Sequence, residues 1–299
     1  MSSNVKEGLE ALESYRPLLF SIAYQMTGSA SEAEDLVQET YLRFQQAQSQ
    51  VKIQSVKSFL TTITVHLAVD YLKSSRHRRE HYVGVWLPEP ILTTGPESLP
   101  GEIVERREAV SIAFLVLLET LNPPERAVFL LREIFDYPYE TIATIIGKSV
   151  TACRQIFHRA QQKLAGKRRH FEAASEAQQA MVAHFLAASQ QGDFDGLLSD
   201  LAEDVAMYGD GGGKAKVVPQ PLHGAEFVAR FFAVATRKAP ADMRVVLSEA
   251  NGMPALLIWE ADALTTVFLF AIREGQVAEI YAQRNPDKLI YLQRQLSQH

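Results

Sequence analysis

One stretch of the chain carries side chains suited to reading the bases of a nucleic acid. In SVTACRQIFHRAQQKL, which begins at Ser149, arginine and glutamine recur on one side of a helical pattern. Arginine pairs with the major-groove edge of guanine and glutamine with that of adenine, each through two hydrogen bonds. We therefore predict base contacts from the start of this helix and phosphate contacts further along it. The predicted DNA-facing residues are Thr151, Arg154, Gln155, His158, Arg159 and Lys163.

The elements that must position these residues are typical of a helix-turn-helix. A short helix over 138–146 reaches a turn at Gly147-Lys148, and Ser149 is suited to cap a second helix over 150–164. The apolar residues of that second helix form one stripe, which we expect to be buried: Val150, Cys153, Ile156, Phe157, Ala160 and Leu164. The alternative is an amphipathic helix with a solvated polar face. The turn, the cap and the absence of any acid from 154 to 170 favour DNA binding.

A second basic stretch precedes the middle of the chain. KSSRHRREH, residues 73–81, holds one glutamate and four basic residues, Lys73, Arg76, Arg78 and Arg79. These are predicted contacts to a nucleic-acid backbone, the alternative being a solvated run of charge. The net charge of −5 does not contradict this, because the segment from Gly192 onward holds 14 acidic and 10 basic residues and so carries −4 of it. Local stripes of charge, and not the total, make phosphate contacts, so modest intrinsic DNA affinity is expected.

The C-terminal half offers groups that could do acid–base chemistry. An isomerase or cyclase needs a carboxylate of raised pKa in an apolar pocket, facing a second acid or a hydrogen-bond donor. The available groups have no spacing that identifies such a site: His184, Asp204, Tyr208, Asp210, His223, Glu260 and Asp262. DGGGK, from Asp210, is interpreted as a turn after a strand and not as a phosphate loop. The single cysteine, Cys153, excludes internal disulfides and a cysteine-rich zinc site, and we expect neither metal nor cofactor.

Bulk composition and the order of elements predict several domains. The chain of 299 residues is 47% hydrophobic and 22% charged, without a signal peptide or a membrane-spanning run, so we expect a soluble cytoplasmic protein. The fold class is predicted as two all-α domains followed by an α+β domain. The predicted helices are 14–28, 31–44, 55–73, 103–121, 123–134, 138–146, 150–164 and 172–191; the predicted strands are 205–210, 244–250, 254–260, 264–273 and 276–283.

Several separated motifs resemble a known family. DLVQETYLRF (35–44) is similar to the core-polymerase-binding helix of sigma factors, and SFLTTITVHLAVDYLK (58–73) resembles the following helices of their second domain. Residues 118–164 resemble their fourth domain. The missing third domain indicates the extracytoplasmic-function subfamily. WLPEP (86–90), DGGGK (210–214) and NPDKL (285–289) together resemble the subgroup with a SnoaL-like C-terminal extension, which has a cone-shaped fold of the nuclear-transport-factor-2 type.

The resemblance implies roles for particular residues. Asp35, Gln38 and Glu39 match positions that bind the polymerase clamp helices, where the residues alone would indicate a solvated acidic face. Residues 59–79 match the surface that reads and melts the minus-ten promoter element. His66 stands in the base-capturing loop, where many relatives have asparagine. The implied domains are sigma domain 2 (1–82), a proline-rich linker (83–101), sigma domain 4 (102–170) and a SnoaL-like domain (171–299).

The linker suggests regulation within the chain. Trp86 is a large aromatic in a proline-rich segment, so we expect WLPEP to dock on the C-terminal domain and to regulate the sigma domains in cis. The residues expected to make this contact are Trp86, Leu87, Pro88, Asp210, Lys214, Asn285, Pro286, Asp287 and Lys288. We expect a monomer, not an enzyme, with core RNA polymerase and promoter DNA as partners; a small-molecule ligand in the C-terminal domain is left open. The alternative functions are a ligand-sensing regulator that acts without polymerase, and an enzyme fused to a DNA-binding module.

Overall fold

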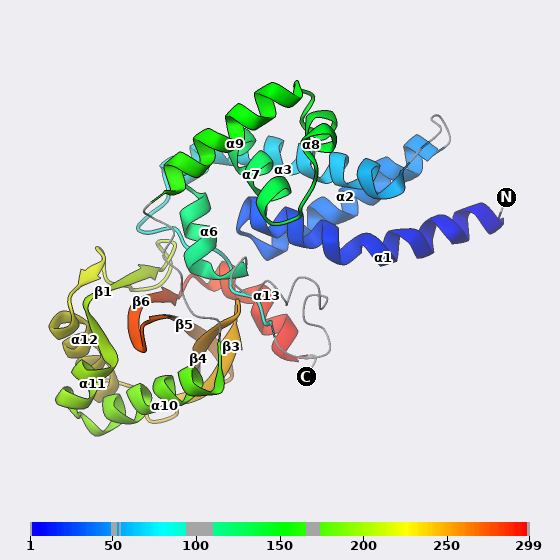
Figure 1. Cartoon of the computed structure of the whole chain (residues 1–299). Helices are drawn as coiled ribbons and strands as arrows, with labels where there is room; N and C mark the ends of the chain where they lie inside the picture. The colour runs from blue at the N-terminus through cyan, green and yellow to red at the C-terminus, as the bar shows by residue number, and fades with distance from the viewer. Residues whose placement is uncertain (1, 49–52, 54, 94–109, 166–173, 298–299) are drawn as a thin grey trace. The chain divides into compact units, whose positions relative to one another are not determined.

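The computed structural model describes residues 2–48, 53, 55–93, 110–165 and 174–297, with only the backbone of 2–12, 48 and 76–80 (Figure 1). Contacts divide the chain into two units. The first holds residues 2–80 and 115–165, and the second holds 81–93, 110–114 and 174–297. Helix α6 (Ile112–Leu118) connects the two along the chain. Within the described ranges, every helix is too short or too polar to cross a bilayer.

Three helices begin the first unit: α1 (Ser2–Thr27), α2 (Ala30–Gln48) and α3 (Val56–Glu80). Each packs against the other two. Leu36, Val37 and Phe44 of α2 are buried, and Thr40 of this buried side has its hydroxyl 3.1 Å from that of Thr64 in α3. Each hydroxyl also lies within hydrogen-bonding distance of a backbone carbonyl of its own helix, so both polar groups are satisfied inside the core.

The second half of this unit holds α7 (Pro123–Glu133), α8 (Tyr139–Ile146) and α9 (Val150–Leu164). Helix α7 packs against α1, α3, α8 and α9. Arg126, which is 2% exposed, donates to the carbonyl oxygen of Met26 at 2.6 Å and to Glu119 at 2.8 Å. Since the last carbonyls of a helix lack partners within it, this arginine stabilises the C-terminal end of α1.

The second unit is built on one curved sheet. Its strands are β1 (Leu201–Asp210), β2 (Leu222–His223), β3 (Arg244–Ala250), β4 (Met253–Glu260), β5 (Ala263–Arg273) and β6 (Gln276–Gln283). They lie in the order β2-β1-β6-β5-β4-β3, antiparallel except for the parallel β1–β6 pair. The β3–β4 and β5–β6 hairpins turn at Asn251-Gly252 and Glu274-Gly275, all with positive φ, as two-residue turns of a right-twisted hairpin require.

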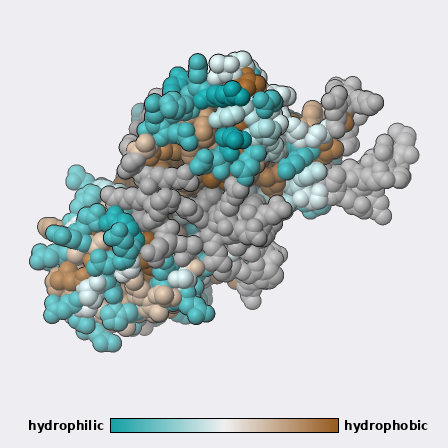
Figure 2. Space-filling view, in the orientation of Figure 1, coloured by the Kyte–Doolittle hydropathy of each residue, from teal (hydrophilic) through white to brown (hydrophobic). Residues whose placement is uncertain are grey.

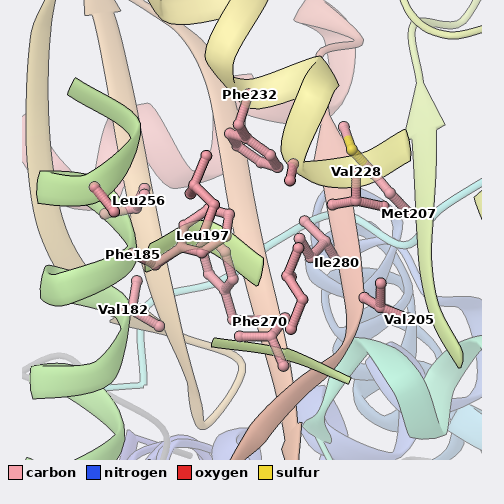
Figure 3. Packing of buried hydrophobic residues seen from close by; sticks show 14 of the residues in the cluster. Val182, Phe185, Leu197, Val205, Met207, Val228, Phe232, Leu256, Phe270 and Ile280 are labelled. Atoms are coloured by element: carbon pink, nitrogen blue, oxygen red, sulfur yellow. The ribbon is translucent and has the colours of Figure 1, made fainter. Parts of the chain in front are cut away.

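Helices α10 (Glu176–Gln191), α11 (Phe194–Asp200) and α12 (Ala225–Arg237) cover one face of this sheet. Figure 3 shows Phe185 of α10 and Phe232 of α12 pointing toward each other between the helices and the strands. Their rings lie 4.9 Å apart at 83°, an edge-to-face pair worth about 0.5–1.5 kcal/mol beyond its burial. Alternate strand residues of the other face, such as Leu257 and Leu269, are also buried, and α13 (Pro286–Ser297) packs against β5.

The predicted fold class is confirmed, and most predicted elements match those observed. Three differences have physical reasons. Helix α1 begins at Ser2, so Pro17 lies inside it and not in its first turn, at the loss of one backbone hydrogen bond. Helix α10 begins at Glu176, because Ser175 and Gln178 form a capping box there. Of the predicted helix 103–121, residues 103–109 lie outside the described residues, and α6 covers Ile112–Leu118.

Candidate functional site

Helix α9 presents the predicted base-reading residues to solvent. The Ser149 hydroxyl accepts a hydrogen bond from the backbone N–H of Ala152 at 3.2 Å, which caps the helix. The residues predicted to face DNA are all exposed: Thr151, Arg154, Gln155, His158, Arg159 and Lys163. In Figure 2 the surface over α8 and α9 is largely hydrophilic. Cys153, Ile156, Ala160 and Leu164 are buried against the unit, and burial raises the pKa of the Cys153 thiol.

Two of these side chains already have partners on neighbouring helices. The guanidinium of Arg154 lies 5.4 Å from the ring of Tyr139, over its face. Lys163 donates to both carboxylate oxygens of Glu125, at 2.9 and 2.7 Å. Burial would raise the pKa of Glu125, but Lys163 and the backbone N–H of Asn122 outweigh it and lower that pKa. Lys163 must therefore leave or share this carboxylate to contact a phosphate.

Helix α2 presents the predicted polymerase-binding residues on its polar side. Asp35 and Gln38 are exposed, and Glu39 is half-buried and accepts a hydrogen bond from Arg43 at 2.7 Å. Leu36, Val37, Thr40 and Phe44, which alternate with them along the helix, are buried. The geometry thus leaves Asp35 and Gln38 available to a partner.

Helix α3 carries the second basic stretch. Lys73 is exposed and forms an ion pair with Asp70 at 3.1 Å. The helix continues to Glu80, but the side chains of Arg76, Arg78 and Arg79 lie outside the described residues.

His66 is held by the helix-turn-helix half of the same unit. Its Nε2 lies 2.6 Å from the carbonyl oxygen of Ile145, the penultimate residue of α8. Because a carbonyl oxygen only accepts, Nε2 carries the proton and donates. The Thr61 hydroxyl lies 3.0 Å from that of Tyr137, and Lys57 lies 5.8 Å over the Tyr137 ring. The two predicted DNA-binding segments therefore touch in this conformation.

In the second unit, WLPEP lies against the ends of β1 and β6, where Leu87 donates to the carboxylate of Asp210 and the Pro88 carbonyl accepts from Gln283. That carboxylate is fully buried and accepts from several donors. Its Oδ1 accepts from the Tyr82 hydroxyl at 2.6 Å and from the Gly212 N–H at 3.0 Å. Its Oδ2 accepts from the Leu87 N–H at 2.9 Å and from Lys288 Nζ at 2.7 Å. A buried carboxylate is thus fully hydrogen-bonded, as its desolvation requires.

Lys288, on α13, is the cation of this cluster. Besides Asp210 it donates to the Leu87 carbonyl at 2.6 Å, and it lies 4.3 Å from the Trp86 ring and 4.7 Å from the Tyr82 ring. Burial, reinforced by the hydrogen bond to Asp210, raises the pKa of Tyr82 well above its usual range, so its hydroxyl stays a donor. We call Tyr82, Trp86, Leu87, Asp210 and Lys288 the linker clamp.

The remaining predicted linker-contact residues surround the clamp. Asn285 Nδ2 donates to the Tyr82 hydroxyl at 2.8 Å, and Lys214 pairs with Asp287 at 2.6 Å, which joins DGGGK to NPDKL. Pro286 begins α13, and Pro88 is buried, with its carbonyl accepting from Gln283 at 3.2 Å. Gly212 has a φ of 56°, and a Cβ there would lie 2.2 Å from Asn285 Nδ2, so only glycine fits. The structure brings all nine predicted residues together.

Sequence reasoning missed a second set of contacts, further along the linker. Ile91 N–H donates to Asn251 Oδ1 at 3.0 Å, and the Thr93 hydroxyl donates to Glu249 at 2.9 Å. Asn251 also donates to the Val110 carbonyl at 2.7 Å. The sequence held one signal for Asn251, since Asn-Gly between two strand-like runs is typical of a tight hairpin. Its bonds to distant backbone had no such signal.

The candidate acid–base groups do not converge. Asp204 pairs with Arg273 at 2.5 Å on the surface, and Tyr208 stacks on Tyr281. His184 lies on the surface beside Asp200, and the hydrogen bond and charge of this carboxylate raise the pKa of the His184 imidazole. Glu260 is the one candidate among these that lines a cavity of this unit, between α10, α12 and the sheet.

Comparisons with known proteins place both helical regions in named families. Residues 11–78 match the model of sigma-70 region 2, and residues 111–164 match that of sigma-70 region 4. The chain is 32% identical to the ECF RNA polymerase sigma factor SigJ of Mycobacterium tuberculosis, over 92% of this chain and 91% of that protein. It is 31% identical to the probable ECF sigma factor SigI of the same organism, over 96% of both chains.

The similarity extends to three dimensions. The crystal structure of the M. tuberculosis extracytoplasmic function sigma factor SigJ superposes with a TM-score of 0.75 at 29% identity. The match covers 95% of this chain and 98% of that one, so it includes both helical regions and the sheet-containing unit.

Proposed function

Because this chain belongs to the extracytoplasmic-function RNA polymerase sigma factors, we propose that it binds core RNA polymerase and directs it to promoters. The proposed partners are core polymerase and promoter DNA, with the protein acting as a monomer. The sheet-containing unit regulates initiation in cis through the linker clamp. Its role is regulatory and not catalytic.

One observation carries this proposal: the match to sigma factors spans nearly the whole chain and includes regions 2 and 4 in order. The exposed faces support the individual roles. Asp35, Gln38 and Glu39 form the proposed polymerase contact, and Arg154 and Gln155 the base contacts of the minus-thirty-five element. A regulator that acts without polymerase has no need of the first set.

His66 and the basic end of α3 are the proposed contacts to the minus-ten element. An unstacked base needs a free stacking or hydrogen-bonding group in its pocket. Since His66 donates to the Ile145 carbonyl in this conformation, it becomes available to a base only when α3 and α8 separate. Promoter melting therefore follows an opening of the helical unit in our proposal.

The linker clamp supports regulation in cis. Residues 87–93 are all buried, although they belong to a segment with the proline-rich composition of a linker. Docking of this segment shortens the free chain available between regions 2 and 4. A change in docking would thus change how far apart the two promoter-binding regions can move.

The experiment is run-off transcription on fragmented genomic DNA of the source organism, with its core polymerase and the purified full chain. New transcript starts that require both components, and that share upstream sequence, are the expected result. If the chain does not co-elute with core polymerase and no new transcript starts appear, the proposal is refuted. Specific duplex binding in that same failed case would favour the polymerase-independent regulator.

A further inference from the structure

A cavity opens between α10, α12 and the sheet of the second unit, on the face opposite the linker clamp. It measures about 290 Å³, close to the lower end of small-molecule sites, which span roughly 300–1,000 Å³. Its wall is mainly apolar and is formed by Phe185, Phe232, Met243, Leu256, Ile258 and Phe268. Figure 3 shows three of these, Phe185, Phe232 and Leu256, directed into the space between α10, α12 and the strands.

A second lobe adjoins this cavity. It measures about 310 Å³ and shares Phe231, Phe268 and Arg284 with the first. The charged side chains that line the two lobes are Lys216, Lys238 and Arg284 against the single carboxylate of Glu260. Three cations and one anion on an apolar wall complement an anionic head on an apolar body.

Arg284 is the polar group best placed for that head. Its guanidinium donates to the Lys216 carbonyl at 2.7 Å and lies 4.0 Å from Glu260. Its Nε is buried and has no hydrogen-bond partner among the described residues. A buried donor left unpaired is destabilising, and a carboxylate is the acceptor that a guanidinium binds through two parallel hydrogen bonds.

Arg284 also lies between two residues whose side chains contact the linker segment. Its backbone N–H donates to the Asp210 carbonyl at 2.7 Å. The residue before it, Gln283, contacts the linker at the Pro88 carbonyl, and the residue after it, Asn285, contacts Tyr82. Gln283, the last residue of β6, thus contacts the linker, and Arg284, which follows it, lines the cavity. A movement of Arg284 toward a ligand would therefore displace its neighbours Gln283 and Asn285 and change their contacts with the linker.

We infer that this cavity binds a small apolar carboxylic acid through Arg284, and that its occupancy changes the docking of WLPEP. Binding itself is independent of the proposed sigma activity, whereas its effect on transcription rests on that function. Coupling is reciprocal, so undocking of the linker must change the affinity for the acid by the same factor.

Calorimetry on the full chain tests the binding step. The probes are dodecanoate, below its micellar concentration, and 2-naphthoate, with dodecanol and 2-naphthol as neutral counterparts. Saturable binding of at least one acid is expected, at least tenfold weaker in Arg284→Gln and unchanged in Arg237→Gln, an exposed arginine of α12 outside the cavity. Ala235→Trp, at the mouth, should also weaken it. Failure of both acids to bind, or equal binding by Arg284→Gln, would overturn the site.

The emission of Trp86 tests the coupling step. Trp259 is the only other tryptophan, so a Trp259→Phe chain reports the linker alone. Saturating acid should shift the Trp86 emission in this chain and leave it unshifted when Arg284→Gln is added. Acid binding without any shift would overturn the coupling and leave the site standing. Transcription measured without acid separates both results from a failure of the proposed function.

Discussion

At the scale of the residue, the periodicity of a helix explains why the polar faces were predictable. Cys153, Ile156, Ala160 and Leu164 recur every three or four positions, so the polar residues between them face solvent. This places Arg154 and Gln155 near the start of α9, where a recognition helix meets base edges. What periodicity did not predict is that Lys163 already has a carboxylate partner in Glu125.

The first prediction concerns base reading by Arg154. Arg154→Ala should weaken binding to the minus-thirty-five element by about 1–3 kcal/mol and relax the preference at one base pair, since an arginine pair with guanine is lost. Competition binding of the polymerase holoenzyme to single-base variants of the element measures this.

Arg159→Ala is the matched control on the same helix. It should weaken binding to all the variant elements alike and reduce the salt dependence, because a phosphate contact carries no sequence information. If Arg154→Ala behaved in this way too, its base-reading role would be wrong.

The second prediction concerns the polymerase contact on α2. Gln38→Ala with Glu39→Ala should abolish co-elution with core polymerase, while circular dichroism and thermal unfolding stay near those of the unchanged chain. Alanine favours the helix, and the bond that this change removes, from Arg43 to Glu39, is exposed and contributes little to stability. Gln45→Ala with Gln46→Ala, exposed on the same helix, is the control. Undiminished co-elution of the first variant would remove α2 from the interface.

At the scale of the element, α7 is held by charge as well as by packing. Asn122 and Glu125 form a capping box at its start, with Glu125 N–H donating to Asn122 at 2.9 Å and Asn122 N–H donating to Glu125 at 3.1 Å. Lys163 adds an ion pair from α9. One buried carboxylate thus caps one helix and binds another.

The third prediction follows from the lowered pKa of Glu125. A carboxylate whose pKa is lower in the folded state stabilises the protein at pH values above its unfolded-state pKa, near 4.5. This stabilisation is lost as the pH falls toward the folded-state pKa. The free energy of unfolding of the first unit should therefore decrease as the pH is lowered from about 5. In Glu125→Gln, which keeps the cap but not the charge, that fall should be shallower. Identical pH profiles would show that the ion pair contributes nothing.

Elements with strong local signals were predicted, and those without were not. The four long antiparallel strands and α7–α9 lie within a few residues of their predicted bounds, because their β-branched runs, caps and turns are local. Helices α11 and α12 were missed. Helix α11 has only seven residues. Helix α12, AEFVARFFAVATR, follows a loop rich in glycine and proline, and its N-cap residue Gly224 provides no side-chain cap, so no local signal marks its start.

At the scale of the whole molecule, the order of the motifs along the chain was sufficient to predict the family but not the contacts of the linker. WLPEP, DGGGK and NPDKL were expected to meet, and they do. The side chains that join them were not all foreseen: Tyr82 and Gln283 act through partners more than 100 residues away along the chain. Such hydrogen bonds depend on tertiary packing and leave no periodic trace.

The last prediction concerns the linker clamp as a switch. Asp210→Asn replaces the charged acceptor of the Tyr82 hydroxyl and the Leu87 N–H by a neutral amide, and a hydrogen bond to a charged group contributes about 1.5–3 kcal/mol. Loss of one such bond moves the docking equilibrium by about tenfold or more, since each 1.4 kcal/mol is about a factor of ten. A chain ending at Arg284 loses Asn285 and Lys288 and should behave in the same way, as should a chain ending before Glu172, which loses the whole sheet.

We therefore expect these three forms, and Trp86→Ala, to share a transcriptional activity that differs from that of the full chain on one promoter. Asp262→Asn, an exposed acid of the same unit, should leave that activity unchanged. Equal activity in every form would mean that the linker docks without regulating initiation.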